Sequence, residues 1–199
     1  MKILKYLIIV IAALVAAFFA VGIIHPVVQY GHEVTVNKPL KEAWAVGYDE
    51  SKYDQWLQGF QSMELLTGEK GEVGSTYKVI VNPGDGQPDF EMIETMVSVT
   101  EFEQVTLHFD SEMMDFDQTM TYTEKDGGVV IKTDSKVMAK GMVMKSMMAL
   151  MEHLSGAFTT QEAKNIDALK RVIEENTTDY YPVMEVPVVE PITEQLVTE

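Results

Sequence analysis

The chain has 199 residues, a formal net charge of -16 and no cysteine. Without cysteine it can form no disulfide, no thiolate metal site and no cysteine nucleophile. The negative charge repels phosphate backbones, so nucleic acid is not an expected partner. Once the terminal segments are set aside, about 150 residues remain, which suits one domain with a real core.

The N-terminal region carries the longest apolar run of the chain. Tyr6 to Ile24 is 19 residues without a charge, and a helix needs about 20 residues to cross a bilayer core. Lys2 and Lys5 precede the run, so the positive-inside rule predicts a cytoplasmic N-terminus and a domain on the outer, periplasmic or extracellular, side. A cleaved signal peptide is the alternative, but the best small-x-small site, Val15-Ala16-Ala17, lies inside the run. We therefore expect a single-pass membrane protein, with residues 1–29 as cytoplasmic end, anchor and stem.

The region after the anchor alternates apolar and polar residues, which is typical of strands. Turn signals separate the alternating segments, the densest being Asn82-Pro83-Gly84-Asp85-Gly86. About seven strands are expected in antiparallel order, over residues 30–37, 63–67, 76–82, 90–102, 105–111, 116–123 and 129–137.

Helices are expected between the first two strands and after the last one. Asn37 is the candidate N-cap of a first short helix that begins near Pro39, and residues 51–58 form a second. From Met142 to Glu175 apolar residues recur at helical spacing without a proline, which predicts one long C-terminal helix with Gly156 as a candidate kink.

The expected order of elements is α+β, with an antiparallel sheet that the long helix must cover. Several short motifs accompany this order: Val34-Thr35-Val36-Asn37-Lys38-Pro39, Ala43-Trp44, Asp49, Trp56, Gly68, Gly71, Gly74-Ser75 and Leu169-Lys170-Arg171-Val172-Ile173-Glu174. With them the sequence resembles the START-like superfamily, also called polyketide cyclase/dehydrase-like or SRPBCC, which has a helix-grip fold. The resemblance covers the domain, residues 30–175. The acidic, proline-containing tail, residues 176–199, is expected to be extended or disordered.

The resemblance implies a deep cavity between the curved sheet and the long helix, which holds a hydrophobic small molecule. The methionines agree with this, since six of the 14 lie between Met138 and Met151 and five more lie on or between the expected strands. Methionine adapts to apolar guests, but it also fills irregular cores, and both interpretations stay open. The expected ligand-binding residues are Tyr77, Met92, Met96, Gln118, Met120, Met147, Leu150, Met151 and Leu154.

The sequence contains no recognisable catalytic motif and no metal-ligand spacing, so neither a cofactor nor a metal is expected. Some members of the superfamily catalyse cyclisation or dehydration with polar cavity residues, for which Glu94 and Tyr122 are the candidates. Glu94 lies between Met92 and Met96 and points inward if they do. The opposite strand register, with Ile93, Thr95 and Val97 inward, is an equal alternative.

These observations lead to three functional hypotheses. The first is a membrane-anchored protein that holds a hydrophobic small molecule or lipid non-covalently. The second is a cyclase or dehydratase acting through polar groups in the cavity. The third is a tethered interaction module whose acidic tail binds a partner. Neither the ligand nor the oligomeric state follows from the sequence.

Overall fold

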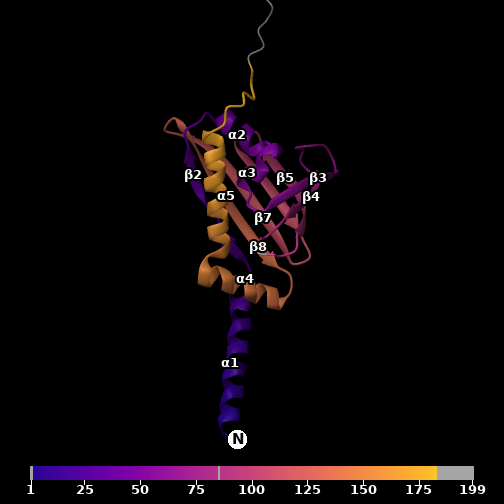
Figure 1. The fold of residues 1–199 in the computed structure, drawn as a ribbon, viewed down its shortest axis with the longest axis vertical. Coiled ribbons are helices and arrows are strands. Elements are labelled where there is room, and N and C mark those ends of the chain that lie inside the picture. The colour runs from indigo at the N-terminus through magenta and orange to yellow at the C-terminus, as the bar shows by residue number, and fades with distance from the viewer. Residues whose placement is uncertain (1, 85, 183–199) are drawn as a thin grey trace, which may run out of the picture.

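The computed structural model of the chain describes residues 2–84 and 86–182. An N-terminal helix projects from a domain in which one curved antiparallel sheet faces the C-terminal helix (Figure 1). The helices are α1 (Lys2–Ile24), α2 (Leu40–Tyr48), the 3-10 turn η1 (Glu50–Lys52), α3 (Tyr53–Trp56), α4 (Met142–Ser155) and α5 (Ala157–Glu174). The strands are β1 (Val28–Tyr30), β2 (Glu33–Val36), β3 (Phe60–Thr67), β4 (Thr76–Val81), β5 (Phe90–Thr100), β6 (Gln104–Asp110), β7 (Met114–Lys125) and β8 (Gly128–Ala139).

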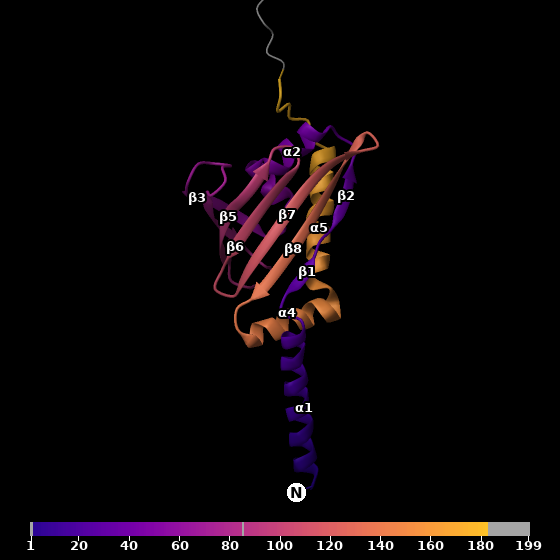
Figure 2. The same cartoon turned by 180° about the vertical axis from the view of Figure 1, so that it is seen from behind.

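The sheet confirms the predicted α+β class and the antiparallel meander. Strands β3 to β8 follow each other as neighbours, and β1 and β2 both pair with β8 at the far edge (Figure 2). The expected strand over residues 30–37 is thus two strands. They separate at Gly31, where a Cβ would overlap the carbonyl oxygen of Thr133, and at His32, whose backbone N–H bonds the Thr133 hydroxyl at 3.1 Å.

The helices differ from the sequence prediction in two places. Asn37 does not cap α2, because Pro39 occupies the N-cap position and no side-chain cap bond forms. The predicted helix from Met142 to Glu175 is two helices, α4 and α5, divided at Gly156. This glycine has φ 59°, the left-handed conformation that ends α4 and turns the chain, so that α4 lies across the end of the domain and α5 runs along the sheet (Figure 1).

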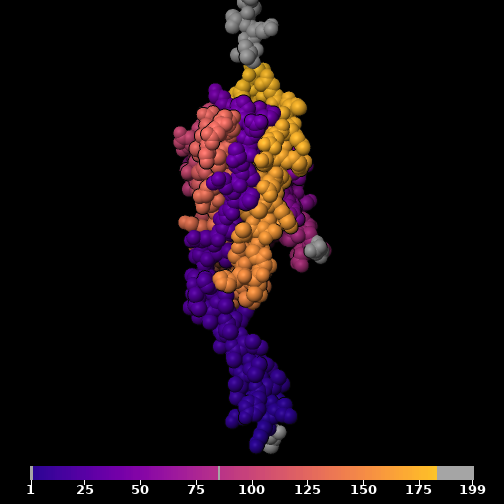
Figure 3. All heavy atoms as spheres, turned by 90° about the vertical axis from the view of Figure 1, so that its left-hand side faces the viewer, coloured from indigo at the N-terminus to yellow at the C-terminus, as the bar shows by residue number. Residues whose placement is uncertain are grey.

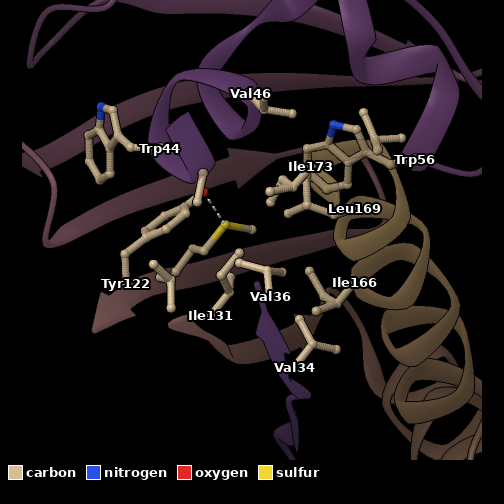
Figure 4. Close-up of a cluster of buried hydrophobic side chains, with 14 of the residues drawn as sticks. Val34, Val36, Trp44, Val46, Trp56, Tyr122, Ile131, Ile166, Leu169 and Ile173 are labelled. Atoms are coloured by element: carbon tan, nitrogen blue, oxygen red, sulfur yellow. Dashed lines mark hydrogen bonds between the residues drawn. The ribbon is translucent and has the colours of Figure 1, made fainter. Parts of the chain in front are cut away.

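The main core lies between the C-terminal half of α5 and the sheet. Ile166, Leu169 and Ile173 on one face of α5 are 1% exposed or less. They pack against Val36 of β2 and Ile131 of β8, while Val46, Trp44 and Trp56 of α2 and α3 close the cluster from above (Figure 4). We call this group the upper cluster.

A second, smaller core lies at the opposite end of the domain, where α4 meets the sheet. It consists of Val28, Val137, Ala139 and Met148, with Tyr30, Met114, Phe116, Met144 and Phe158 packed around them. We call it the lower cluster. The two clusters hold the ends of the sheet against helices and leave the space between them to the cavity described below.

The apolar helix α1 contacts the domain only through its last turns. Gly22 is its one buried residue among those described, and a Cβ there would lie 2.9 Å from the Cα of Ser146 on α4. Two small residues thus let the helix backbones approach closely. Just after α1, the ring of His25 lies 5.1 Å from the ring of His153 on α4. Figure 3 shows α1 leaving from the end of the domain at which α4 lies.

The first residues of the predicted tail pack on the domain. The Asn176 side chain bonds a Glu42 carboxylate oxygen at 3.0 Å, and the Tyr180 hydroxyl bonds Asp49 at 2.6 Å. These contacts lie at the end of the domain opposite α1 (Figure 1). The rest of the expected tail, residues 183–199, lies outside the described residues.

The break at Gly156 yields the first prediction. Replacing Gly156 with alanine should destabilise the fold by about 1–2 kcal/mol, because alanine resists the left-handed conformation. Gly156→Asn should lose clearly less, since asparagine tolerates that conformation. A Cβ at position 156 would lie no closer than 3.6 Å to any neighbour, the nearest being the Thr160 hydroxyl, so steric crowding adds little to the loss of stability. Urea unfolding of the full chain in detergent measures both variants, and equal losses would show that conformational strain is not the cause.

Candidate functional site

A cavity of about 540 Å³ lies between the sheet and the N-terminal half of α5. Its size falls within the range of small-molecule sites, about 300–1,000 Å³. Five strands, β3 to β7, supply alternate side chains to one wall, and α5 supplies the facing one. The residues from the sheet are Phe60, Met63, Tyr77, Val79, Val81, Met92, Glu94, Met96, Val105, Leu107, Phe109, Phe116, Gln118, Met120 and Tyr122. Those from β1, from the helices and from the loops include Tyr30, Gly47, Tyr48, Glu50, Tyr53, Trp56, Leu57, Gln58, Lys70, Gly71, Phe158, Gln161, Glu162, Asn165 and Ile166.

The register of β5 settles which of the two sequence alternatives holds for Glu94. Met92, Glu94 and Met96 face the cavity, and Glu94 is only 7% exposed. Val97 on the other face is 48% exposed. The carboxyl of Glu94 is therefore held inside an otherwise apolar wall rather than in solvent.

Most of the sequence-predicted site residues meet in this cavity. Tyr77, Met92, Met96, Gln118 and Met120 line it, as do the candidate catalytic residues Glu94 and Tyr122. The Tyr122 hydroxyl is occupied, since it donates to the Met120 sulfur at 3.1 Å, shown by the dashed line in Figure 4. Gly47 makes room for that hydroxyl, because a Cβ there would overlap it. Whether these residues bind a ligand remains a prediction.

The other four predicted ligand-binding residues lie elsewhere. Met147, Leu150, Met151 and Leu154 are on α4 and are not among the residues that line the cavity. The sequence pattern predicted Met147, Leu150 and Leu154 on the same apolar stripe as Ile166 and Leu169. The turn at Gly156 breaks that stripe, so α4 passes beneath the domain and these side chains point away from the sheet; Leu154 is 78% exposed.

Glu94 lies in an environment that differs strongly from water. Burial raises the pKa of its carboxyl to about 7, and the nearby negative charge of Glu50 adds to the rise. At neutral pH this group is therefore divided between a neutral acid, which donates a hydrogen bond, and a carboxylate, which accepts one. Among the described residues no side chain bonds the carboxyl of Glu94, which leaves it available to a guest.

Three tyrosines surround the same part of the cavity. Burial raises the pKa of Tyr48 to about 12, with smaller contributions from Tyr77 and Glu94. Burial also raises the pKa of Tyr53, and Glu94 makes the next largest contribution. The phenols of Tyr48 and Tyr53 therefore stay neutral at any physiological pH. The hydroxyl of Tyr48 contacts the Met96 sulfur at 3.6 Å, while that of Tyr77 accepts a hydrogen bond from the Gly71 N–H at 2.8 Å.

An ion pair lies at the surface end of the group formed by Glu94 and the three tyrosines. The Lys70 ammonium lies 2.8 Å from the Glu50 carboxylate, and both residues line the cavity. The Lys70 side chain is 70% exposed, so the pair is in contact with water. Lys70 and the exposed Gln58 mark where the cavity reaches the surface.

A second polar group faces the first from α5. The Gln118 amide donates to the Glu162 carboxylate at 3.0 Å and to the Ser135 hydroxyl at 3.2 Å. Burial raises the pKa of Glu162, which hydrogen bonds from Thr133 and Gln118 and the nearby His32 partly offset. The cavity thus has apolar walls with a carboxyl group on each of two sides.

The sequence reasoning did not identify Glu162, Tyr48 or Lys70 as site residues. A signal for Glu162 existed, since it lies four residues after Phe158 and four before Ile166, on the predicted apolar stripe. Lys70 lies between two glycines in a turn and had no such signal. Its place at the cavity depends on how the β3–β4 loop folds.

The remaining candidates do not form a second site. His108 lies on the outer face of β6 and bonds Asp117 at 2.6 Å. Within the described residues no group of three or more histidine, aspartate or glutamate side chains is arranged to hold a metal ion. Asp115 instead pairs with Lys140 at 2.9 Å.

Comparison with solved structures places the fold. No family model matches the sequence, and no curated protein does. Ara h 8.0201 is 18% identical with a TM-score of 0.54, covering 75% of this chain and 99% of that one. A protein of Thermus thermophilus is 9% identical with a TM-score of 0.62, covering 76% and 100%. Truncated norcoclaurine synthase from Thalictrum flavum is 16% identical with a TM-score of 0.53, covering 75% and 95%. The chain therefore has the helix-grip fold, which the sequence resemblance to the START-like (SRPBCC) superfamily predicted.

Proposed function

We propose that this protein is a membrane-anchored carrier or sensor that holds a hydrophobic small molecule or lipid, non-covalently, in the cavity between the sheet and α5. The observation that carries the proposal is the cavity itself. Closely packed interiors contain few voids larger than a water molecule, whereas this one measures about 540 Å³. Its lining is mostly aliphatic, aromatic and methionine side chains, which attract an apolar guest.

The few polar groups in the cavity would orient such a guest. Glu94 and Glu162 lie on opposite walls, and the neutral phenol of Tyr48 lies near Glu94. A carbonyl, hydroxyl or amine on an otherwise apolar molecule would find a donor or acceptor there. A guest with one polar end is therefore favoured over a pure hydrocarbon, which would leave these buried groups without partners.

The anchoring part of the proposal is supported by α1. Its 23 residues span about 35 Å, enough to cross a bilayer core. Helices of this kind also occur as signal sequences, but here the last turns pack on α4 at Gly22 and Ser146, beyond the candidate cleavage site. With Lys2 and Lys5 on the cytoplasmic side, the domain lies on the outer side.

Structures with this fold support the binding of small molecules. One of them is described as norcoclaurine synthase from Thalictrum flavum in complex with dopamine and hydroxybenzaldehyde; it is 17% identical with a TM-score of 0.53. Another is the di-domain ARO/CYC StfQ from the steffimycin biosynthetic pathway, at 12% identity and a TM-score of 0.57. The fold thus accommodates aromatic small molecules, and these two relatives bring the second candidate, catalysis.

Catalysis is favoured by the position of Glu94 in the cavity wall, where burial raises the pKa of its carboxyl to about 7. A general acid or base works best when its pKa lies near the working pH. Glu94 could therefore move a proton to or from a carbonyl compound in the cavity. Any molecule that co-purifies with the full chain should be identified by mass spectrometry, returned to the wild type and to Glu94→Gln, and followed for conversion. Conversion by the wild type alone, with equal binding, would establish the enzyme; an unchanged molecule in both establishes the carrier.

The binding proposal predicts that filling the cavity abolishes occupancy. Leu107→Trp places a large side chain into the cavity from β6, so the molecule that co-purifies with the wild type should be lost. Native mass spectrometry of the full chain released from detergent measures this. Val97→Trp, on the exposed face of the neighbouring strand, is the matched control and should retain the bound molecule. Retention by Leu107→Trp would place the binding site elsewhere.

Another prediction concerns pH and Glu94. The folded carboxyl has a pKa of about 7 against an ordinary value of 4.5. Between these values the unfolded chain releases the proton that the folded protein keeps. The free energy of unfolding should therefore fall as pH rises from about 4.5 to about 7 and then level off. At 1.36 kcal/mol per pKa unit the loss is about 3 kcal/mol.

Glu94→Gln should remove this part of the pH dependence, because the amide does not titrate. Above pH 7 the variant should then be more stable than the wild type. Urea unfolding of the full chain in detergent, at about pH 5 and about pH 8, compares the two. Glu91→Gln, on the exposed face of the same strand, serves as the control. A wild-type profile that Glu94→Gln leaves unaltered would show that Glu94 does not carry the effect.

A further inference from the structure

Helix α4 has an apolar stripe that the described part of the chain leaves mostly exposed. Val143, Met147, Leu150, Met151 and Leu154 follow one another at intervals of three or four residues, apart from the adjacent pair 150 and 151, and so share one face of the helix. Val143 is 60% exposed, and Met147 and Met151 are 41% and 46% exposed. The stripe contains no charged residue. A contiguous apolar face of this kind marks a surface that meets another apolar phase.

The other sides of α4 are already occupied. Met144 and Met148 pack into the lower cluster beneath the sheet. Ser146 and His153 lie on another side and meet Gly22 and His25 at the end of α1. At 100° per residue, the stripe lies roughly opposite Ala149 and Glu152 on the helix, and Ala149 is buried, so the stripe faces away from the domain. This is the direction in which α1 extends (Figures 1 and 3).

The contact at Gly22 also fixes the depth of α4. The apolar run ends at Ile24, two residues after Gly22, and each helical residue advances about 1.5 Å. The level at which α4 crosses α1 is therefore within about 3 Å of the end of the membrane-spanning segment. That level is the boundary between hydrocarbon and headgroups, where amphipathic helices lie with the apolar face buried about 5–10 Å.

We propose that α4 is an interfacial helix whose stripe is immersed in the outer leaflet of the bilayer that α1 crosses. This proposal rests on the membrane anchoring proposed for α1. The occupant is lipid rather than a second copy of the chain, because the bilayer lies on the side of the stripe at the depth that Gly22 sets. The domain then sits directly on the membrane in one orientation, held by two helices, instead of swinging from a flexible stem.

The absence of cysteine from the sequence allows a direct test with the full chain. Leu154→Cys, Met147→Cys and Leu14→Cys are each labelled with a fluorophore and reconstituted in phosphatidylcholine vesicles. Quenching is measured with lipids brominated either near the carbonyl end or near the middle of the acyl chains, and with aqueous iodide. Val97→Cys is the matched control, because it is 48% exposed, like Met151, but lies on the outer face of β5.

The labels at 154 and 147 should be quenched by the lipid brominated near the carbonyl end and should lose most of their quenching by iodide. The label at 14, in the middle of α1, should respond to the lipid brominated in mid-chain, and the label at 97 to iodide alone. Quenching of 154 and 147 by iodide alone, or by neither agent, overturns the interfacial placement while a lipid-exposed label at 14 keeps the anchor. A label at 14 that no lipid quenches overturns both proposals.

A double substitution adds a second check. Met147→Asp with Val143→Asp should remove the lipid quenching of a label at Leu154→Cys and leave that at Leu14→Cys unchanged, because a carboxylate does not enter the apolar boundary. Met147→Leu with Val143→Ile, which keeps the stripe apolar, should behave as the wild type. Since all these positions are exposed, the fold should be retained, and circular dichroism confirms it. Persistent lipid quenching in the aspartate variant overturns the proposal.

Discussion

The contact on which the rest of the structure depends is the packing of the C-terminal half of α5 against the sheet. Ile166, Leu169 and Ile173 are almost fully buried there, and they join the long helix to β2 and β8. Truncating one such side chain to alanine typically costs about 2–5 kcal/mol. Toward the N-terminal end of α5 the residues that face the cavity become polar, as Glu162 and Asn165 show. Polar side chains there do not close the gap as Leu169 does, so the same helix that builds the core also leaves the cavity.

The cavity explains why an ionisable group persists in so apolar a wall. A carboxylate buried without a partner is energetically unfavourable. Burial therefore raises the pKa of Glu94 to about 7, and the neutral acid persists up to that pH. A leucine in its place would stabilise the empty domain but offer nothing to the polar end of a guest. Ionisable residues that are buried in apolar surroundings commonly belong to functional sites. Glu162, buried on the opposite wall beside Gln118, is another such residue.

The sequence predicted the structure best where the spacing of apolar residues along a segment determines the secondary structure. Alternation along each strand predicted the meander and placed Tyr77, Met96 and Met120 on one face. It could not decide for Glu94, because both faces of β5 carry apolar residues and only the pairing with β4 and β6 selects the inner one. The spacing of apolar residues in the C-terminal region also predicted helix correctly, but the structure has two helices there instead of one. One residue with φ 59°, Gly156, redirected four predicted ligand-binding residues from the cavity to the far end of the domain.

Because of the turn at Gly156, α4 lies next to the residues that form one end of the cavity. Tyr30, Phe116 and Phe158 belong both to the cavity lining and to the lower cluster, where they pack around Met148 of α4. The ring of Tyr30 lies 5.5 Å from that of Phe158 and 6.3 Å from that of Phe116. A single layer of aromatic side chains therefore separates the cavity from α4.

In the proposed orientation the other face of α4 touches lipid. Any movement of α4 at the bilayer surface must displace these rings, because close-packed side chains transmit strain rather than absorb it. The floor of the cavity is thus built on the helix that we propose meets the membrane.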